Sequence, residues 1–300
     1  MPETLPPPFP RRLRALIFPA LAGLSVAVAA LMGACSPSPP AAPPAAPSAH
    51  QPAAAAAASP ARIVPTANPN SVAPNDRGAA ANTADAMQAI RALSGDPQAL
   101  LEAYRQGASR ATTLDLTPFG ITPASVIADI GSGTGALPVR LLVEGTPFAR
   151  LYAVETDASS LDVLGAALEV LPDSERVERV HSRLDDASLP PASVDRVIVI
   201  DTGVGCLPTA DSGVALPPMR VQAGERMLAS IRSAVTPDAQ VHVLRPWNAL
   251  PVPPRRCPKE WVVHAFDQAG FRLLDDHPQT PPEGADTRHQ AFHLVFAPAG

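Results

Sequence analysis

The feature that most constrains this chain is an apolar run at residues 126–130 that ends directly in three alternating glycines. The run, Val-Ile-Ala-Asp-Ile, is short and β-branched, which predicts a buried strand of a parallel sheet. Gly131, Gly133 and Gly135 then allow a sharp turn and a close approach to a ligand. A helix is expected at residues 134–144, with its free N–H groups pointing at the loop. The pattern therefore predicts a strand that ends in a binding loop.

Strand and helix patterns alternate along residues 83–300, with helices alone over 83–120 and the mixed core over 121–300. The expected strands lie at 126–130, 150–154, 177–181, 195–200, 240–244, 272–275 and 289–296. The expected helices lie at 83–93, 97–108, 134–144, 159–171, 219–235 and 261–269. This alternation predicts an α/β fold with a doubly wound, mostly parallel seven-stranded sheet and an antiparallel strand at its C-terminal edge.

The first 82 residues have a different character. Arginines precede an uncharged apolar stretch at 15–34, which indicates an export signal peptide over residues 1–35. Leu-Met-Gly-Ala-Cys at 31–35 resembles the bacterial lipoprotein lipobox, which implies lipidation of Cys35 and a place in the cell envelope, at the outer membrane or periplasmic face. The alternative is an uncleaved helix that anchors the chain in the inner membrane. Residues 36–82 are rich in Pro and Ala, which predicts a disordered tether.

The net charge and the remaining cysteines argue against nucleic-acid binding and against a metal site. The net charge is −5 and no basic patch occurs, so we expect no nucleic-acid partner. Cys206 and Cys257 show no metal-ligand spacing, and they are either two isolated thiols or one disulfide. No metal site is expected. The histidines without mutual spacing, which we expect to be structural, are His181, His242, His264 and His277.

Four motifs, in order, resemble the class I S-adenosylmethionine-dependent methyltransferases. Residues 129–135, Asp-Ile-Gly-Ser-Gly-Thr-Gly, are similar to that family's first motif. Residues 155–157, Glu-Thr-Asp, resemble its acidic second-strand end, and 184–197 resemble the stretch between its third and fourth strands. Ala-Gly-Phe at 269–271 is like its late helix-to-strand junction. The resemblance implies a Rossmann-like fold, the cofactor S-adenosyl-L-methionine and methyl transfer.

The resemblance also implies which residues hold the cofactor. Glu155 is expected to accept hydrogen bonds from the ribose hydroxyls, and Asp185, with Asp186 as the near alternative, is expected to meet the adenine. Tyr104, on an expected helix, is interpreted as packing. The full set of cofactor candidates is Asp129, Gly131, Ser132, Gly133, Gly135, Glu155, Asp185, Asp186 and Asp201.

A dinucleotide-binding loop is the main rival for the glycine motif, since Gly131, Gly133 and Ala136 fit Gly-x-Gly-x-x-Gly/Ala. Asp129 argues against it, because a carboxylate at that position repels an anionic pyrophosphate. The zwitterionic, sulfonium-bearing end of S-adenosylmethionine suits an acidic loop. Methyl transfer is therefore favoured over hydride transfer.

The sequence says less about the residues that surround the methyl acceptor. Asp201, at the end of a central strand, is the candidate general base or cofactor-lining acid, with a loop-capping role as the alternative. The loop at 201–208 consists of small residues and is expected to be flexible, and residues 245–247 are expected to form the opposite wall. The acceptor is expected to be a small molecule. Because S-adenosylmethionine is made in the cytoplasm, an exported domain of this kind also fits a non-catalytic lipoprotein that serves as a binding or interaction module.

Overall fold

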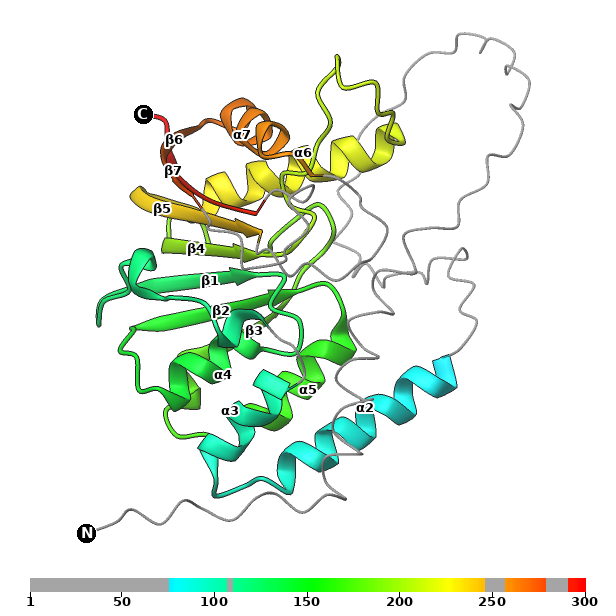
Figure 1. Cartoon of the computed structure of the whole chain (residues 1–300), viewed down its shortest axis with the longest axis vertical. Coiled ribbons are helices and arrows are strands. Elements are labelled where there is room, and N and C mark those ends of the chain that lie inside the picture. The colour runs from blue at the N-terminus through cyan, green and yellow to red at the C-terminus, as the bar shows by residue number, and fades with distance from the viewer. Residues whose placement is uncertain (1–75, 107–109, 246–256, 279–290) are drawn as a thin grey trace, which may run out of the picture.

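A seven-stranded sheet forms the centre of the computed structural model, which describes residues 76–106, 110–245, 257–278 and 291–300 (Figure 1). Its strand order is β3-β2-β1-β4-β5-β7-β6. The strands are β1 (Val126–Ile130), β2 (Arg150–Glu155), β3 (Val177–His181), β4 (Val194–Ile200), β5 (Val235–Arg245), β6 (Phe271–Pro278) and β7 (Phe292–Pro298). The first five pair in parallel, and β7 pairs antiparallel with both β5 and β6. The predicted α/β fold is confirmed, with β7 inserted between its neighbours so that β6 forms the edge.

Helices cover both faces of the sheet. On one face lie α6 and α7, and on the other lie α4 and α5, with α3 packed on α4 and α2 packed on α5 (Figure 1). The α-helices are α2 (Asp76–Arg91), α3 (Pro97–Gln106), α4 (Ala136–Val143), α5 (Ala158–Leu168), α6 (Pro218–Ala234) and α7 (Lys259–Gln268). Three short 3-10 helices are η1 (Arg110–Thr112), η2 (Thr117–Phe119) and η3 (Ser174–Arg176).

Burial on both faces explains the continuous apolar sequence of β1. Ile127 contributes to the core under α4 and α5, whereas Ala128 and Ile130 contribute to the core under α6 and α7. All three side chains are at most 2% exposed. A central parallel strand has no solvent face, so it needs apolar residues at successive positions rather than at alternate ones. The carboxyl end of β1 is thereby fixed from both sides, and the glycine loop begins there.

Several helix boundaries differ from the expected ones, and two of them have a clear local reason. Helix α2 begins at Asp76, inside the segment expected to be tether, because the alanines at 79–81 have the highest helix propensity of any residue. Helix α4 begins at Ala136 rather than Thr134, because Gly135 has a left-handed φ of 89° and is its N-cap. The predicted signal peptide, Cys35 and most of the tether lie outside the described residues. Among the described helices, none combines the length and the apolar character that a membrane span requires.

Candidate functional site

The glycine loop is tied to the end of β2 by its own backbone. The N–H groups of Gly131 and Ser132 both donate to the carbonyl of Val154, at 2.8 and 3.1 Å. Gly131 has a φ of 77°, and a side chain there would strike the methyl group of Thr202, which follows β4. The loop therefore adopts one compact path between β2 and the loop after β4, and only glycine fits at its first position.

The carboxylate of Glu155 closes this loop from the β2 side. One oxygen, Oε2, accepts the N–H of Gly133 at 2.9 Å. The other, Oε1, accepts the N–H groups of Thr156 and Asp157 at 2.7 and 3.1 Å. The structure thus brings Glu155 and the glycine loop together, as predicted from the resemblance. A carboxylate held by three backbone donors is a fixed acceptor for a ligand at the loop.

A second carboxyl lies beneath the loop. Asp129 is only 3% exposed, and burial raises its pKa from 3.8 to about 7, with the charge of nearby Glu155 as a further cause. Desolvation and a neighbouring like charge both disfavour the ionised form. A cationic group bound at this end of the loop would offset both effects, so the pair Asp129 and Glu155 favours a positively charged ligand over an anionic one.

Two features of the loop leave room and a polar partner for a ligand. The hydroxyl of Ser132 is buried, at 9% residue exposure, and has no hydrogen-bond partner. A buried hydroxyl without a partner costs free energy, which a ligand group can recover by forming the missing hydrogen bond. A Cβ placed on Gly133 would meet no atom within 4 Å. The middle of the loop therefore borders open space, next to an unpaired hydroxyl.

The N-terminal helices pack on this loop from outside the sheet. The hydroxyl of Tyr104 in α3 is buried and donates to the carbonyl of Thr134 at 2.7 Å. Sequence reasoning assigned Tyr104 to packing, and the hydrogen bond to the loop was missed because the contact joins residues that are 30 positions apart. Tyr104 therefore holds the glycine loop as well as filling the core.

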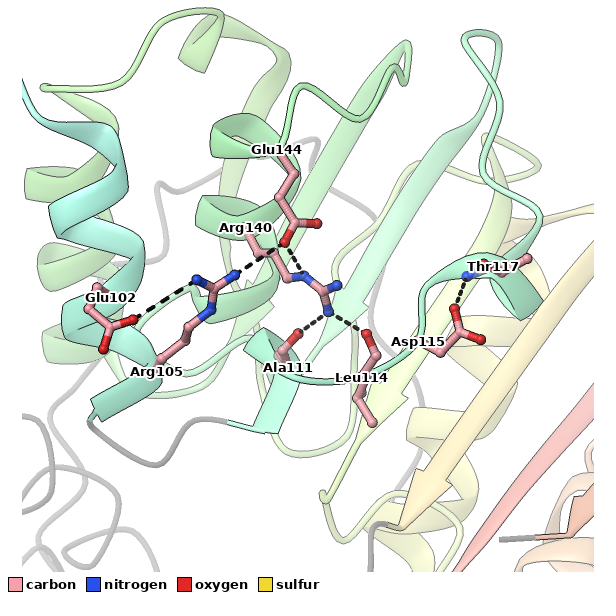
Figure 2. Close-up of polar contacts among 8 residues, drawn as sticks. All are labelled: Glu102, Arg105, Ala111, Leu114, Asp115, Thr117, Arg140 and Glu144. Atoms are coloured by element: carbon pink, nitrogen blue, oxygen red, sulfur yellow. Dashed lines mark hydrogen bonds and ion pairs between the residues drawn. The ribbon is translucent and has the colours of Figure 1, made fainter. Parts of the chain in front are cut away.

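Arg140 fixes the connection that follows α3 (Figure 2). Its guanidinium donates to the carbonyls of Ala111 and Leu114, at 3.0 and 2.6 Å, and to Glu144 at 2.9 Å. Glu144 also pairs with Arg105 of α3 at 3.6 Å. Because Arg140 lies in α4, which starts directly after the glycine loop, this cluster anchors the N-terminal segment to the same helix that the loop leads into.

The loop after β3 places the two adenine candidates differently. It begins beside Glu155, since the N–H of Ser182 donates to the carbonyl of Glu155 at 2.9 Å. Asp185 pairs with the exposed side chains of Arg226 and Arg183, at 3.1 and 3.3 Å. Asp186 accepts bonds from the N–H of Ser188 and the hydroxyl of Ser230, both at 2.8 Å.

The backbone bond from Ser188 and the bond from Ser230 lower the pKa of Asp186. Both partners of Asp186 hold the turn in place and fix it to α6, which is a structural task. Asp185 is held only by side chains that are themselves more than half exposed, at 57% for Arg226 and 77% for Arg183. Of the two, Asp185 has the partners that a ligand can more readily replace.

The loop after β4 packs on one side against the protein core, and its flexibility stays a prediction. Asp201 has a left-handed φ of 53°, and its N–H donates to the carbonyl of Leu244 at 2.9 Å. Val204, Cys206 and Leu207 pack against the core under α6 and α7. The sequence shows small residues at these positions but not the helices that close over them.

Cys206 and Cys257 form a disulfide, with their Cα atoms 5.3 Å apart, which decides between the two alternatives left open by the sequence. A pocket beside the disulfide is lined mostly by apolar side chains, with Asp201 and Arg245 as its charged members. Trp247, expected in the opposite wall, lies outside the described residues. The pocket lies at the carboxyl ends of β4 and β5 and has room for about one water molecule, so a methyl acceptor would need it to open.

Three histidines gather on the opposite face of the sheet, which η2 covers. Nδ1 of His242 lies 3.1 Å from Nε2 of His293, and the ring of His277 lies 4.8 Å from that of His293. The ring of Phe119 meets His242 edge-on. Burial lowers the pKa of His242 to about 3 and that of His293 to about 4, with other histidines as a second cause. Within the described ranges, neither these histidines nor any other group of three or more His, Cys, Asp or Glu side chains is arranged to hold a metal ion.

Comparisons with known proteins give matches to solved structures alone. No protein-family model matches the chain, and no curated protein matches it. A chain from the complex between the Haloferax volcanii Trm112 methyltransferase activator and a methyltransferase shares 14% identity, over 70% of this chain and 98% of its own length, with a TM-score of 0.46.

Two further solved structures are similar at the same level. A TehB-like SAM-dependent methyltransferase from Corynebacterium glutamicum shares 16% identity, over 67% of this chain and 97% of its own, with a TM-score of 0.45. A SAM-dependent methyltransferase from Aquifex aeolicus shares 15% identity, over 70% and 97%, with a TM-score of 0.42. The fold assignment rests on the sheet order described above.

Proposed function

We propose that this chain binds S-adenosyl-L-methionine and transfers its methyl group to a small-molecule acceptor. The observation that carries the proposal is the buried, unpaired hydroxyl of Ser132, in a loop whose centre at Gly133 borders open space. Two carboxyls, Asp129 and Glu155, lie at the same loop and favour a cationic ligand. A dinucleotide is disfavoured by the same charges, because its pyrophosphate is anionic.

The cofactor supplies a methyl group on a positively charged sulfur, and the protein's task is to hold and orient both reactants. In the proposed site, the hydroxyl of Ser132 holds the amino-acid end of the cofactor, Glu155 holds the ribose and Asp185 meets the adenine. Asp129, once ionised, attracts the cofactor's ammonium group. Asp201, at the pocket between β4 and β5, accepts a proton where the acceptor carries one at the reacting atom.

Calorimetry of the full chain in detergent, titrated with S-adenosylmethionine and with its demethylated product, tests the cofactor part. We expect heat of binding with both ligands and its loss in Glu155→Ala. The matched control is Glu175→Ala, which removes an exposed carboxylate from η3 and is expected to bind as the parent does. Absence of heat with either ligand would refute the enzymatic proposal.

We also propose that the domain is tethered in the cell envelope by lipid on Cys35, after a signal peptide and through the Pro/Ala-rich segment. The disulfide between Cys206 and Cys257 supports this, because structural disulfides persist in oxidising compartments. Radiolabelled palmitate fed to expressing cells is expected to label the parent and not Cys35→Ser. Label that persists in Cys35→Ser would refute lipidation at that cysteine and leave the uncleaved anchor.

The second candidate is a non-catalytic lipoprotein that uses the fold as a binding or interaction module. The disulfide favours it, since it fits a compartment away from the site of cofactor synthesis. The ion pairs of Asp185 with Arg226 and Arg183 favour it as well, because they occupy the carboxylate proposed to meet the adenine. The two candidates differ in the calorimetric test, where the non-catalytic module gives no heat.

A further inference from the structure

We infer that Cys206 and Cys257 are positioning residues, and that their disulfide holds the glycine loop in its binding conformation through the loop after β4. The inference rests on the proposed function for its ligand, S-adenosylmethionine or its demethylated product. It assigns a role in cofactor binding to two residues that line the pocket beside Asp201 and are not among the proposed cofactor contacts. It also makes cofactor affinity depend on the oxidation state of the protein.

The loop around Cys206 packs closely against two helices. Gly205 has a φ of 76°, and a Cβ there would lie 2.8 Å from the ring of Phe266 in α7. A Cβ on Gly224 in α6 would lie 2.7 Å from the side chain of Leu207. The loop therefore contacts α7 through Gly205 and α6 through Leu207.

The disulfide adds a covalent restraint to this packing. Cys257 is 6% exposed and lies two residues before the start of α7 at Lys259. The bond joins the loop after β4 to the segment that leads into α7, across 51 residues of chain. A loop held only by van der Waals contacts samples other positions, whereas a cross-linked one stays within reach of its partner.

The loop after β4 also lies against the glycine loop of the proposed cofactor site. The methyl group of Thr202 occupies the place of a side chain at Gly131, 2.5 Å from where a Cβ would stand. The hydroxyl of Thr202 accepts the N–H of Val204 at 3.2 Å, so Thr202 moves with the rest of its loop. A displacement of the loop after β4 therefore moves Thr202 away from the side of Gly131 that a Cβ would fill.

Reduction of the disulfide removes this covalent restraint without changing any residue. A dithiol such as dithiothreitol transfers two electrons and two protons to the Cys206–Cys257 bond, which yields two thiols and oxidises the reagent to its cyclic disulfide. We expect the glycine loop of the reduced protein to adopt its binding conformation for about a tenth of the time. The apparent Kd for the cofactor or its demethylated product then rises about tenfold.

The experiment measures the affinity of the full chain for the demethylated cofactor product in the oxidised, reduced and reoxidised states, well below the unfolding temperature. Alkylation followed by mass spectrometry verifies the state of both cysteines. We expect weaker binding after reduction, recovery after reoxidation, and weak binding of Cys206→Ala/Cys257→Ala that dithiothreitol does not change. Equal affinity in the oxidised and reduced protein would overturn the inference.

Hydrogen exchange provides a readout that needs no ligand. Reduction is expected to speed amide exchange in the glycine loop at residues 131–135, while the peptide covering β3, Val177–His181, stays unchanged. If the oxidised protein binds no ligand, the proposed function fails, and exchange at 131–135 still decides the inference. Faster exchange confined to the loop after β4 would show a merely local role for the disulfide and refute the coupling.

Discussion

Asp129→Asn is expected to stabilise the protein above neutral pH and to have little effect in acid. The pKa of Asp129 rises from 3.8 in the unfolded chain to about 7 in the fold, because the carboxyl is buried and lies near Glu155. Between these values the folded state keeps a proton that the unfolded state releases, so stability falls as the pH rises from about 4 to 7 and is level above. Three units of pKa correspond to about 4 kcal/mol.

Asparagine has no proton to lose, so the stability difference between variant and parent isolates this single titration. Urea unfolding followed by circular dichroism at pH 4, 5.5, 7 and 8.5 measures it, since all other titrating groups are common to both proteins. We expect the advantage of Asp129→Asn to grow by about 1.4 kcal/mol per pH unit from 4 to 7. Asp162→Asn, at an exposed position in α5, is the control and is expected to show no such growth. A difference that does not change with pH would refute the reasoning.

Three further predictions address the loop, the histidines and the disulfide. Tyr104→Phe removes the buried bond to the Thr134 carbonyl and is expected to lower the free energy of unfolding by about 1–2 kcal/mol in urea titrations at pH 7. The pKa of His242 is lowered to about 3, so between pH 6.5 and 3 the unfolded chain binds a proton that the fold does not, and the free energy of unfolding decreases as the pH falls. His242→Phe is expected to reduce this decrease. An unchanged dependence of the free energy of unfolding on pH would count against the prediction. Loss of the 51-residue cross-link in Cys206→Ala/Cys257→Ala is expected to cost about 4 kcal/mol, measured against the oxidised parent.

The central strands and the glycine loop were predictable because their signals are local. Residues 126–135 contain both the apolar run and the glycines, and burial on both faces requires that composition. Glu155 was predictable for a related reason, since parallel neighbours bring their carboxyl ends to one edge of the sheet. The different partners of Asp185 and Asp186 were not, because they include Arg226 and Ser230 in α6, more than 40 residues away.

The features missed from the sequence all depend on which distant elements meet. His242 and His293 become neighbours because β7 folds back between β5 and β6, a pairing that no local spacing encodes. The loop after β4 looked flexible because Gly203 and Gly205 are small. In the fold, Gly205 is required because Phe266 of α7 leaves no room for a side chain. Gly205 therefore suggests a flexible backbone when only the sequence is known, whereas in the structure it allows close packing against α7.

The position of the disulfide connects the two halves of the chain. The N-terminal sequence predicts export, and export predicts an oxidising surrounding in which Cys206 and Cys257 stay paired. That pair is proposed to hold the loop that touches Gly131, so export, as predicted, would also keep the proposed cofactor loop in its binding conformation. A domain kept in the reducing cytoplasm would lose the cross-link and, with it, the restraint on Gly131. If the site binds S-adenosylmethionine and the chain is exported as predicted, binding is strongest away from the compartment that makes the cofactor, and activity would require cofactor that reaches the oxidising side.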